Sequence, residues 1–271
     1  MQYSEKKRTI TAGHLTVSYT DEGMVSAPAI IFIHGFPLNK SMWNRQIEAL
    51  KPNYRVIAYD IRGFGNSDAG NDDFSIELFV SDLLGLMGAL NLDKAMLCGF
   101  SMGGYIALNA IQNHPERFNA LILCDTNCTA DKPEAKEKRM KSIENIKEKG
   151  LEQYADESLK KLFAAVSVSK QIEEIAIVKE MILKTSKPTI YKTLHALAER
   201  KATCTQLHEI KVPVLILVGK EDEITPPEVA LLMHEKIKGS TLHIIEQAGH
   251  LSNIENSDEF NEHLIKFMAF V

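Results

Sequence analysis

The motif Gly99-Phe100-Ser101-Met102-Gly103 restricts what this chain can fold into more than any other stretch. It follows the apolar segment Ala95–Cys98, which predicts a short buried strand, and precedes Tyr105–His114, which predicts a helix. A serine between glycines at a strand-to-helix turn is typical of a nucleophile elbow, where the hydroxyl stands exposed at the tip of a strained turn. The glycines matter because backbone segments approach closely there and a Cβ would clash. We therefore expect Ser101 to be a nucleophile.

A glycine-rich turn before a helix can also bind phosphate at the helix N-terminus. The motif here lacks both the spacing of a dinucleotide-binding turn and the lysine of a nucleotide-binding P-loop. Nucleophilic chemistry explains the serine better than phosphate binding does.

Apolar runs and amphipathic segments alternate over the first half of the chain, which predicts an α/β fold with a mostly parallel central sheet and helices on both faces. The run Ala29–Ile33 is apolar throughout, as expected for a strand covered on both faces. The predicted strands are Arg8–Thr11, Leu15–Thr20 (antiparallel to the first), Ala29–Ile33, Tyr54–Tyr59, Ala95–Cys98 and Phe118–Cys124. The predicted helices are Ser41–Leu50, with Ser41 as N-cap, Ser75–Leu90 and Tyr105–His114.

This alternation stops between Asp131 and about Lys201, where helical patterns follow one another without a strand signal. The alternation then resumes with a strand at Val214–Val218, a helix at Pro227–Lys238, a strand at Leu242–Ile245 and a closing helix from Ser257. We therefore expect one α/β core, residues 1–130 and 202–271, interrupted by a helical cap insertion, residues 131–201.

Composition excludes several classes of function. The 271 residues are 45% hydrophobic, enough for one α/β core, and the net charge of −5 provides no basic field for nucleic acid. No apolar run has transmembrane length, and Met1–Arg8 is charged without a following hydrophobic segment, unlike a secretory signal. We expect a cytoplasmic monomer or homodimer that acts on a small molecule without contacting membranes.

The four cysteines, Cys98, Cys124, Cys128 and Cys204, lack metal-ligand spacing with histidines. We expect them to be reduced, buried thiols, with no disulfide or metal at the one close pair, Cys124 and Cys128.

A serine nucleophile needs a base and an orienting carboxylate. His250 follows the predicted strand Leu242–Ile245 and is the last histidine before the closing helix. Asp222 follows the preceding strand of the predicted sheet, which gives the order serine, acid, histidine of hydrolases with this elbow. Asp125, at the end of another strand, is the competing acid. The carboxyl ends of parallel strands share one sheet edge, so these side chains can meet there.

An oxyanion needs two donors. The backbone N–H of Met102 comes with the elbow, and we expect the second from Phe36 in the turn that follows Ala29–Ile33, with His34 bracing that turn. We expect the substrate pocket to include Met42, Trp43, Cys128, Phe163 and the cap helices, although Trp43 could equally be simple packing.

Together these residues resemble the α/β-hydrolase-fold serine hydrolases, in particular bacterial carboxylesterases and 3-oxoadipate enol-lactonase-like enzymes. The resemblance is carried by Asp222 and by four motifs: His34–Pro37 (HGFP), Asp60–Ser67 (DxRGxGxS), Gly99–Gly104 (GFSMGG) and Ala248–Asn253 (AGHLSN). It implies an esterase or lactonase that needs no cofactor or metal and works through an acyl-enzyme on Ser101, with Asp222 and His250 completing the triad.

The resemblance also limits the alternatives. Haloalkane dehalogenases and epoxide hydrolases have a similar layout but carry aspartate where Ser101 stands, which argues against both. Three readings stay open: a 3-oxoadipate enol-lactonase proper, a perhydrolase side activity, and a small-molecule receptor that keeps the triad but turns over little.

Overall fold

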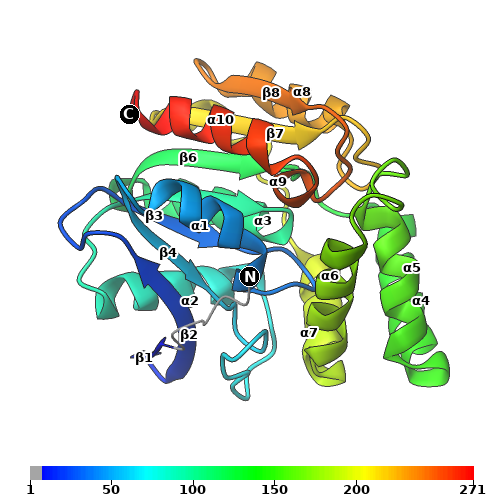
Figure 1. Cartoon of the computed structure of the whole chain (residues 1–271). Helices are drawn as coiled ribbons and strands as arrows, with labels where there is room; N and C mark the ends of the chain where they lie inside the picture. Colours follow the sequence, from blue (N-terminus) through cyan, green and yellow to red (C-terminus); the bar gives the residue numbers. More distant parts are fainter. Residues whose placement is uncertain (1–7) are drawn as a thin grey trace.

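The computed structural model describes residues 8–271, which form an eight-stranded sheet in the order β1-β2-β4-β3-β5-β6-β7-β8 (Figure 1). β2 runs antiparallel to β1 and β4, and the other neighbouring strands are parallel. The α/β prediction with a mostly parallel sheet is therefore confirmed. The strands are β1 (Arg8–Ala12), β2 (Leu15–Glu22), β3 (Ala29–Ile33), β4 (Arg55–Tyr59), β5 (Ala95–Phe100), β6 (Phe118–Cys124), β7 (Val214–Gly219) and β8 (Thr241–Ile245).

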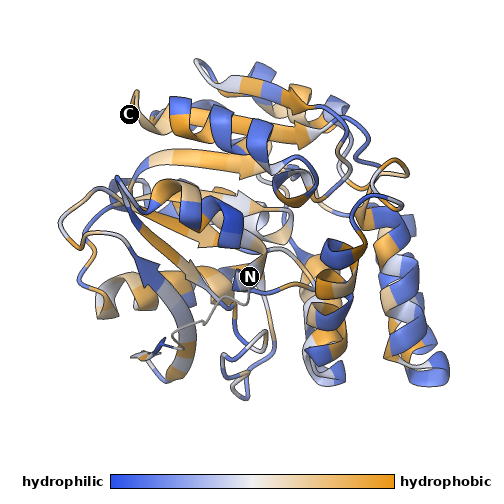
Figure 2. Cartoon of the chain, in the orientation of Figure 1, coloured by the Kyte–Doolittle hydropathy of each residue, from blue (hydrophilic) through white to orange (hydrophobic). Residues whose placement is uncertain are grey.

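Helices cover both faces of this sheet. Alternate residues of one strand enter different cores: Ile31 packs with α2 and α3, whereas Phe32 packs with α1 and α10. The apolar stripes of these helices face the sheet, and their polar faces point outward (Figure 2). The core helices are α1 (Asn44–Leu50), α2 (Ile76–Ala89), α3 (Met102–Asn113), α8 (Pro227–Lys236), α9 (Ser252–Glu255) and α10 (Ser257–Met268); short 3-10 turns are η1 (Lys40–Trp43), η2 (Pro115–Arg117) and η3 (Leu207–Glu209).

One local expectation needs correction, and one short helix was not predicted. The segment after β3 begins with a 3-10 turn, and Asn39, not Ser41, caps it by accepting a hydrogen bond from the Ser41 amide at 3.0 Å. The short helix α9 was not predicted, because four residues are too few to show helical periodicity.

Four helices lie between β6 and β7, beyond the carboxyl ends of these strands (Figure 1). They are α4 (Pro133–Lys149), α5 (Leu151–Leu162), α6 (Ile172–Lys184) and α7 (Lys187–Glu199), and we call them the helical insert. Ile143 and Ile146 of α4 pack against Ile190 and Leu194 of α7 in a small core of their own. The insert thus stands at the edge of the sheet where Ser101 lies.

The prediction of buried, reduced thiols is confirmed for two cysteines and wrong for the other two. Cys128 and Cys204 form a disulfide, whereas Cys98 and Cys124 are buried free thiols with their Sγ atoms 3.7 Å apart. The two bonded cysteines are 76 residues apart in sequence, just before and just after the insert. They meet because the segment that leaves the insert runs beside the segment that enters it: the Thr203 amide donates to the Cys128 carbonyl at 2.8 Å.

No helix within residues 8–271 is long and apolar enough to cross a membrane. Residues Met1–Lys7, on which the prediction about a secretory signal rested, lie outside the described part of the chain.

Candidate active site

Ser101 occupies a strained turn between β5 and α3, with φ of 50° and ψ of −113°. Its amide donates to the Cys124 carbonyl at 2.9 Å, and its carbonyl accepts from the Thr126 hydroxyl at 2.7 Å. A Cβ added at Gly103 would lie 2.3 Å from the Ile33 carbonyl oxygen, so only glycine lets α3 approach β3 this closely. The strand-turn-helix signal in the sequence thus corresponds to a nucleophile elbow.

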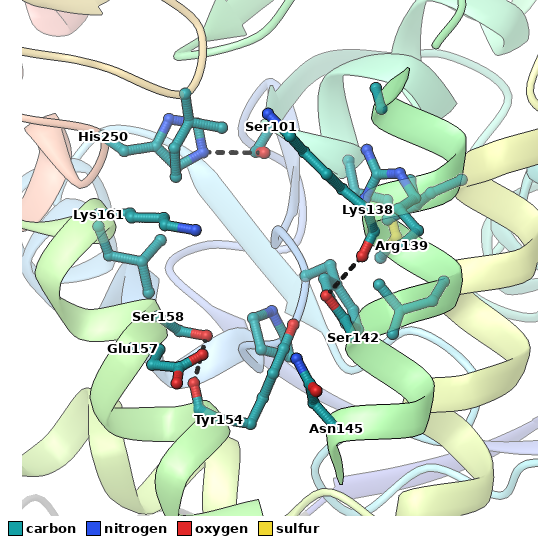
Figure 3. A pocket seen from close by; sticks show the side chains of 18 of the residues that line it. Ser101, Lys138, Arg139, Ser142, Asn145, Tyr154, Glu157, Ser158, Lys161 and His250 are labelled. Atoms are coloured by element: carbon teal, nitrogen blue, oxygen red, sulfur yellow. Dashed lines mark hydrogen bonds between the residues drawn. The ribbon is translucent and has the colours of Figure 1, made fainter. Parts of the chain in front are cut away.

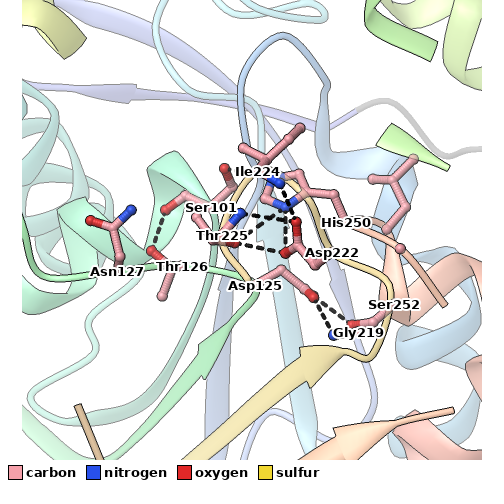
Figure 4. A network of polar contacts seen from close by, with 12 residues as sticks. Ser101, Asp125, Thr126, Asn127, Gly219, Asp222, Ile224, Thr225, His250 and Ser252 are labelled. Atoms are coloured by element: carbon pink, nitrogen blue, oxygen red, sulfur yellow. Dashed lines mark hydrogen bonds and ion pairs between the residues drawn. The ribbon is translucent and has the colours of Figure 1, made fainter. Parts of the chain in front are cut away.

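Ser101, His250 and Asp222 are joined in one hydrogen-bonded chain (Figure 4). His250 Nε2 lies 3.0 Å from Ser101 Oγ, and His250 Nδ1 lies 2.8 Å from Asp222 Oδ2. All three residues are buried, with Ser101 the most exposed at 9%. The structure therefore brings the three predicted side chains together in the geometry of a catalytic triad.

Asp222 is held by its own loop. Its Oδ1 accepts from the amides of Ile224 and Thr225 at 2.8 and 2.9 Å, and its Oδ2 accepts from the Thr225 hydroxyl at 2.7 Å. Burial alone raises the pKa of this carboxyl, but attraction to His250 and the hydrogen bonds from His250 and Thr225 outweigh it, and the pKa lies below its ordinary value. Asp222 therefore stays ionised and accepts from His250 Nδ1–H.

Asp125, the competing acid, is buried beside the triad but faces away from His250 (Figure 4). Its Oδ1 accepts from the Gly219 amide at 2.8 Å, and its Oδ2 accepts from the Ser252 hydroxyl. Burial, and secondarily the charge of Asp222, raises its pKa well above the ordinary value. Asp125 thus ties β6 to β7 and α9.

His34 braces the turn that holds Phe36, as expected from the sequence. Its Nδ1–H donates to the Gly35 carbonyl and its Nε2 accepts from the Ile61 amide, both at 2.9 Å. Burial lowers the pKa of His34 to about 4, so the ring is neutral. Phe36 and Met102 both line the cavity next to Ser101, while the role of their N–H groups as oxyanion donors stays a prediction.

A cavity of about 350 Å³ lies between the core and the insert, with Ser101 and His250 in its wall (Figure 3). The core contributes Phe36, Pro37, Ser101, Met102, Tyr105, Ile224 and His250. The insert contributes Ala135, Lys138, Arg139, Ser142, Asn145, Lys149, Gly150, Gln153, Tyr154, Glu157, Ser158, Lys161, Leu162, Leu194 and Leu197. The substrate-sized space next to the nucleophile is therefore lined mainly by the insert.

The charged residues that the insert contributes to the lining are predominantly cationic. Arg139 pairs with Asp131, which is shared with Arg200. Within residues 8–271, Lys138, Lys149 and Lys161 form no ion pair, and the one acidic side chain in the lining is Glu157. Lys138 from α4 and Lys161 from α5 extend from opposite walls (Figure 3). The cavity thus favours an anionic group near Ser101.

The predicted cap helices line this cavity, but the individual side chains predicted for the pocket lie outside the lining, which corrects that part of the expectation. Trp43 is fully buried beneath the site, with its ring centroid 4.6 Å from that of Phe32. Cys128 is bonded in the disulfide, and Phe163 is buried in the core below α5, next to Leu162, which does line the cavity. Met42 is likewise buried in that core.

Sequence reasoning missed the polar face of α4. Lys138, Ser142, Asn145 and Lys149 recur at helical spacing, a signal visible in the sequence. A polar helical stripe more often faces solvent, and only the position of α5 opposite α4 turns this one into a cavity wall.

Comparisons with known proteins identify relatives of the same fold. A family model described as alpha/beta hydrolase fold matches residues 28–257. The 3-oxoadipate enol-lactonase 2 of Acinetobacter baylyi is 31% identical over 255 residues, which cover 94% of this chain and 94% of that protein. A solved thermophilic esterase from Thermogutta terrifontis, with malate bound, has a TM-score of 0.92 at 32% identity and covers 98% of each chain. The enol-lactonase from Burkholderia xenovorans LB400 has a TM-score of 0.90 at 27% identity, covering 97% of this chain and all of that one.

Proposed function

The chain belongs to the α/β-hydrolase family, and we propose that it is a serine hydrolase that cleaves a carboxylic ester or lactone through an acyl-enzyme intermediate. The observation that carries the proposal is the bonded chain from Ser101 Oγ through His250 to the ionised Asp222, at the wall of a cavity large enough for a small molecule.

In this mechanism, Ser101 Oγ attacks the carbonyl carbon while His250 Nε2 takes the hydroxyl proton. Asp222 holds the imidazole with its Nδ1–H toward the carboxylate and stabilises the imidazolium that forms. A 3.0 Å contact between Nε2 and Oγ is within proton-transfer distance, so no rearrangement of these two side chains is needed.

The N–H groups of Phe36 and Met102 stabilise the negative charge on the former carbonyl oxygen, at about 3 to 4 kcal/mol for a donor of this kind. His250 then gives its proton to the leaving alkoxide, which in a lactone stays attached to the acyl group. A water molecule, activated by the same imidazole, attacks the acyl-enzyme and releases the acid.

Among ester and lactone substrates, the cavity favours those that carry a carboxylate. Lys138, Lys149 and Lys161 line it and form no ion pair with any residue from 8 to 271, so a substrate carboxylate would be attracted toward Ser101. The relatives named as 3-oxoadipate enol-lactonases and the malate-bound esterase structure support the same choice. An enol-lactonase activity is therefore the second candidate.

The test compares p-nitrophenyl acetate and butyrate with a p-nitrophenyl ester of matched length that ends in a carboxylate, together with an enol-lactone. We expect turnover of all of them, with the highest kcat/KM for the anionic substrates. A fluorophosphonate probe should label the wild type at Ser101 and leave Ser101→Ala unlabelled. Labelling at Ser101 without turnover of any substrate would contradict the proposed enzyme and favour a receptor that keeps the triad.

A further inference from the structure

Glu255 places a buried carboxylate behind the catalytic histidine. The residue lies on α9, five positions after His250, and is 8% exposed. Its Oε1 accepts from the amide of Gly249 at 2.9 Å and from that of Leu251 at 3.3 Å. One carboxylate oxygen thus holds the backbone on both sides of His250.

The second oxygen of the same carboxylate reaches the insert. Glu255 Oε2 accepts from the amide of Ala164, two residues after the end of α5, at 2.8 Å. The Leu251 amide also points to the Leu162 carbonyl at 3.2 Å. A Cβ added at Gly249 would lie 2.6 Å from the Ala164 nitrogen, so the histidine loop lies in direct contact with this end of the insert.

Helix α5 in turn forms one wall of the cavity. Tyr154, Lys161 and Leu162 are part of the lining, and Leu162 is the last residue of the helix. A substrate that contacts α5 therefore contacts an element that Glu255 bonds to the histidine loop.

The carboxylate of Glu255 is buried at a cost in free energy. Removing a charge from water is costly, and burial raises the pKa of Glu255 above its ordinary value despite the hydrogen bonds that it accepts. What the carboxylate supplies is two acceptor oxygens in a fixed geometry, able to bind amides of two separate segments at once.

We propose that Glu255 is a positioning residue that fixes His250 relative to α5. The imidazole of His250 then keeps the same position relative to the α5 wall of the cavity during turnover. The proposal rests on the proposed function in taking His250 as the general base. Glu255 acts through the backbone of Gly249, Leu251 and Ala164, and its carboxylate also accepts a hydrogen bond from the side chain of Ser167.

The variant Glu255→Gln tests this. Glutamine keeps the size, but its NH₂ group cannot accept from an amide, so one of the two connections is lost. We expect kcat for p-nitrophenyl acetate to fall by about tenfold to hundredfold with little change in KM, because a small misplacement of a catalytic group has effects of this size. The matched control, Glu262→Gln on the exposed face of α10, should leave kcat and KM unchanged. An unchanged kcat in folded Glu255→Gln, with only a lower Tm, would overturn the proposal.

A second readout needs no substrate. The low-field proton resonance of His250 Nδ1–H reports the bond to Asp222 and should shift or broaden in Glu255→Gln while staying in place in Glu262→Gln. If the wild type hydrolyses no ester or lactone, the proposed function fails, and this resonance still decides whether Glu255 positions the ring.

Should Glu255→Gln not fold, Gly249→Ala replaces it, since its methyl group would push the histidine loop away from Ala164 without changing the carboxylate. The same fall in kcat and the same change in the resonance are expected. A folded Gly249→Ala variant that matches the wild type in both would overturn the proposal.

Discussion

Asp222 Oδ2 lies 2.8 Å from His250 Nδ1. Asp125, which follows the neighbouring strand β6, accepts hydrogen bonds from Gly219 and Ser252 instead. The two carboxylates are close enough that the charge of Asp222 raises the pKa of Asp125. Their different partners give them different functions: Asp222 orients the imidazole, and Asp125 connects strands.

Asp222→Asn should therefore lower kcat by about 10⁴-fold with substrate binding almost unchanged, because the amide favours the wrong tautomer of His250. Asp125→Asn should cost about tenfold or less, since an amide can still accept from Gly219 and donate to Ser252, and one hydrogen bond has a net worth of about 1 kcal/mol. Steady-state kinetics of both variants check this. The reverse ranking would assign the acid to β6.

Much of this site could be predicted because its residues end strands. Apolar runs such as Ala29–Ile33 and Phe118–Cys124 match β3 and β6 to the residue, and parallel strands bring their carboxyl ends to one edge. Ser101, Asp222 and His250 each follow such a run, so topology alone places them together.

The pocket could not be predicted in the same way, because a residue's surroundings depend on elements far away in sequence. Trp43 sits on a helical segment that could have faced either the cavity or the core, and contacts with Phe100 and Phe260 decide for the core. Glu255 shows no signal in the sequence, because its partner Ala164 lies 91 residues away. The division into core and cap domain stays a prediction.

The neutral His34 predicts a pH dependence of stability. Its pKa is about 4 in the folded protein and about 6.5 unfolded, so between these values the unfolded chain binds a proton that the folded chain does not. Stability therefore falls as pH decreases from 7 to 4, by about 3 kcal/mol from this residue.

Denaturant unfolding of the wild type and His34→Asn at several pH values tests this. The variant should be less stable at pH 7 and should lose less stability on acidification. His208→Asn, at an exposed histidine, is the control and should follow the wild type. A wild-type and a His34→Asn curve that run parallel from pH 7 to 4 would contradict a buried neutral ring.

The disulfide Cys128–Cys204 closes a loop that contains the whole insert. Cys204→Ser should lower the free energy of unfolding by about 2 to 4 kcal/mol, because the unfolded chain regains the freedom of this long loop. A reducing agent should produce a comparable loss in the wild type and none in the variant. Cys98→Ser is the control for a cysteine outside the disulfide, and equal sensitivity of the wild type and Cys204→Ser to reduction would disprove the bond.

The final prediction concerns Lys138 and Lys161, which face one another across the cavity (Figure 3). If they attract a substrate carboxylate, Lys138→Ala and Lys161→Ala should each raise KM for the carboxylate-terminated ester by about fivefold to tenfold, as loss of roughly 1 kcal/mol of charge interaction implies. The matched neutral ester should change little, and added salt should weaken the difference. Lys160→Ala removes a neighbouring charge that is absent from the lining and controls for net charge. Equal losses on the anionic and neutral esters would show that the lysines support the insert's structure and do not select the substrate.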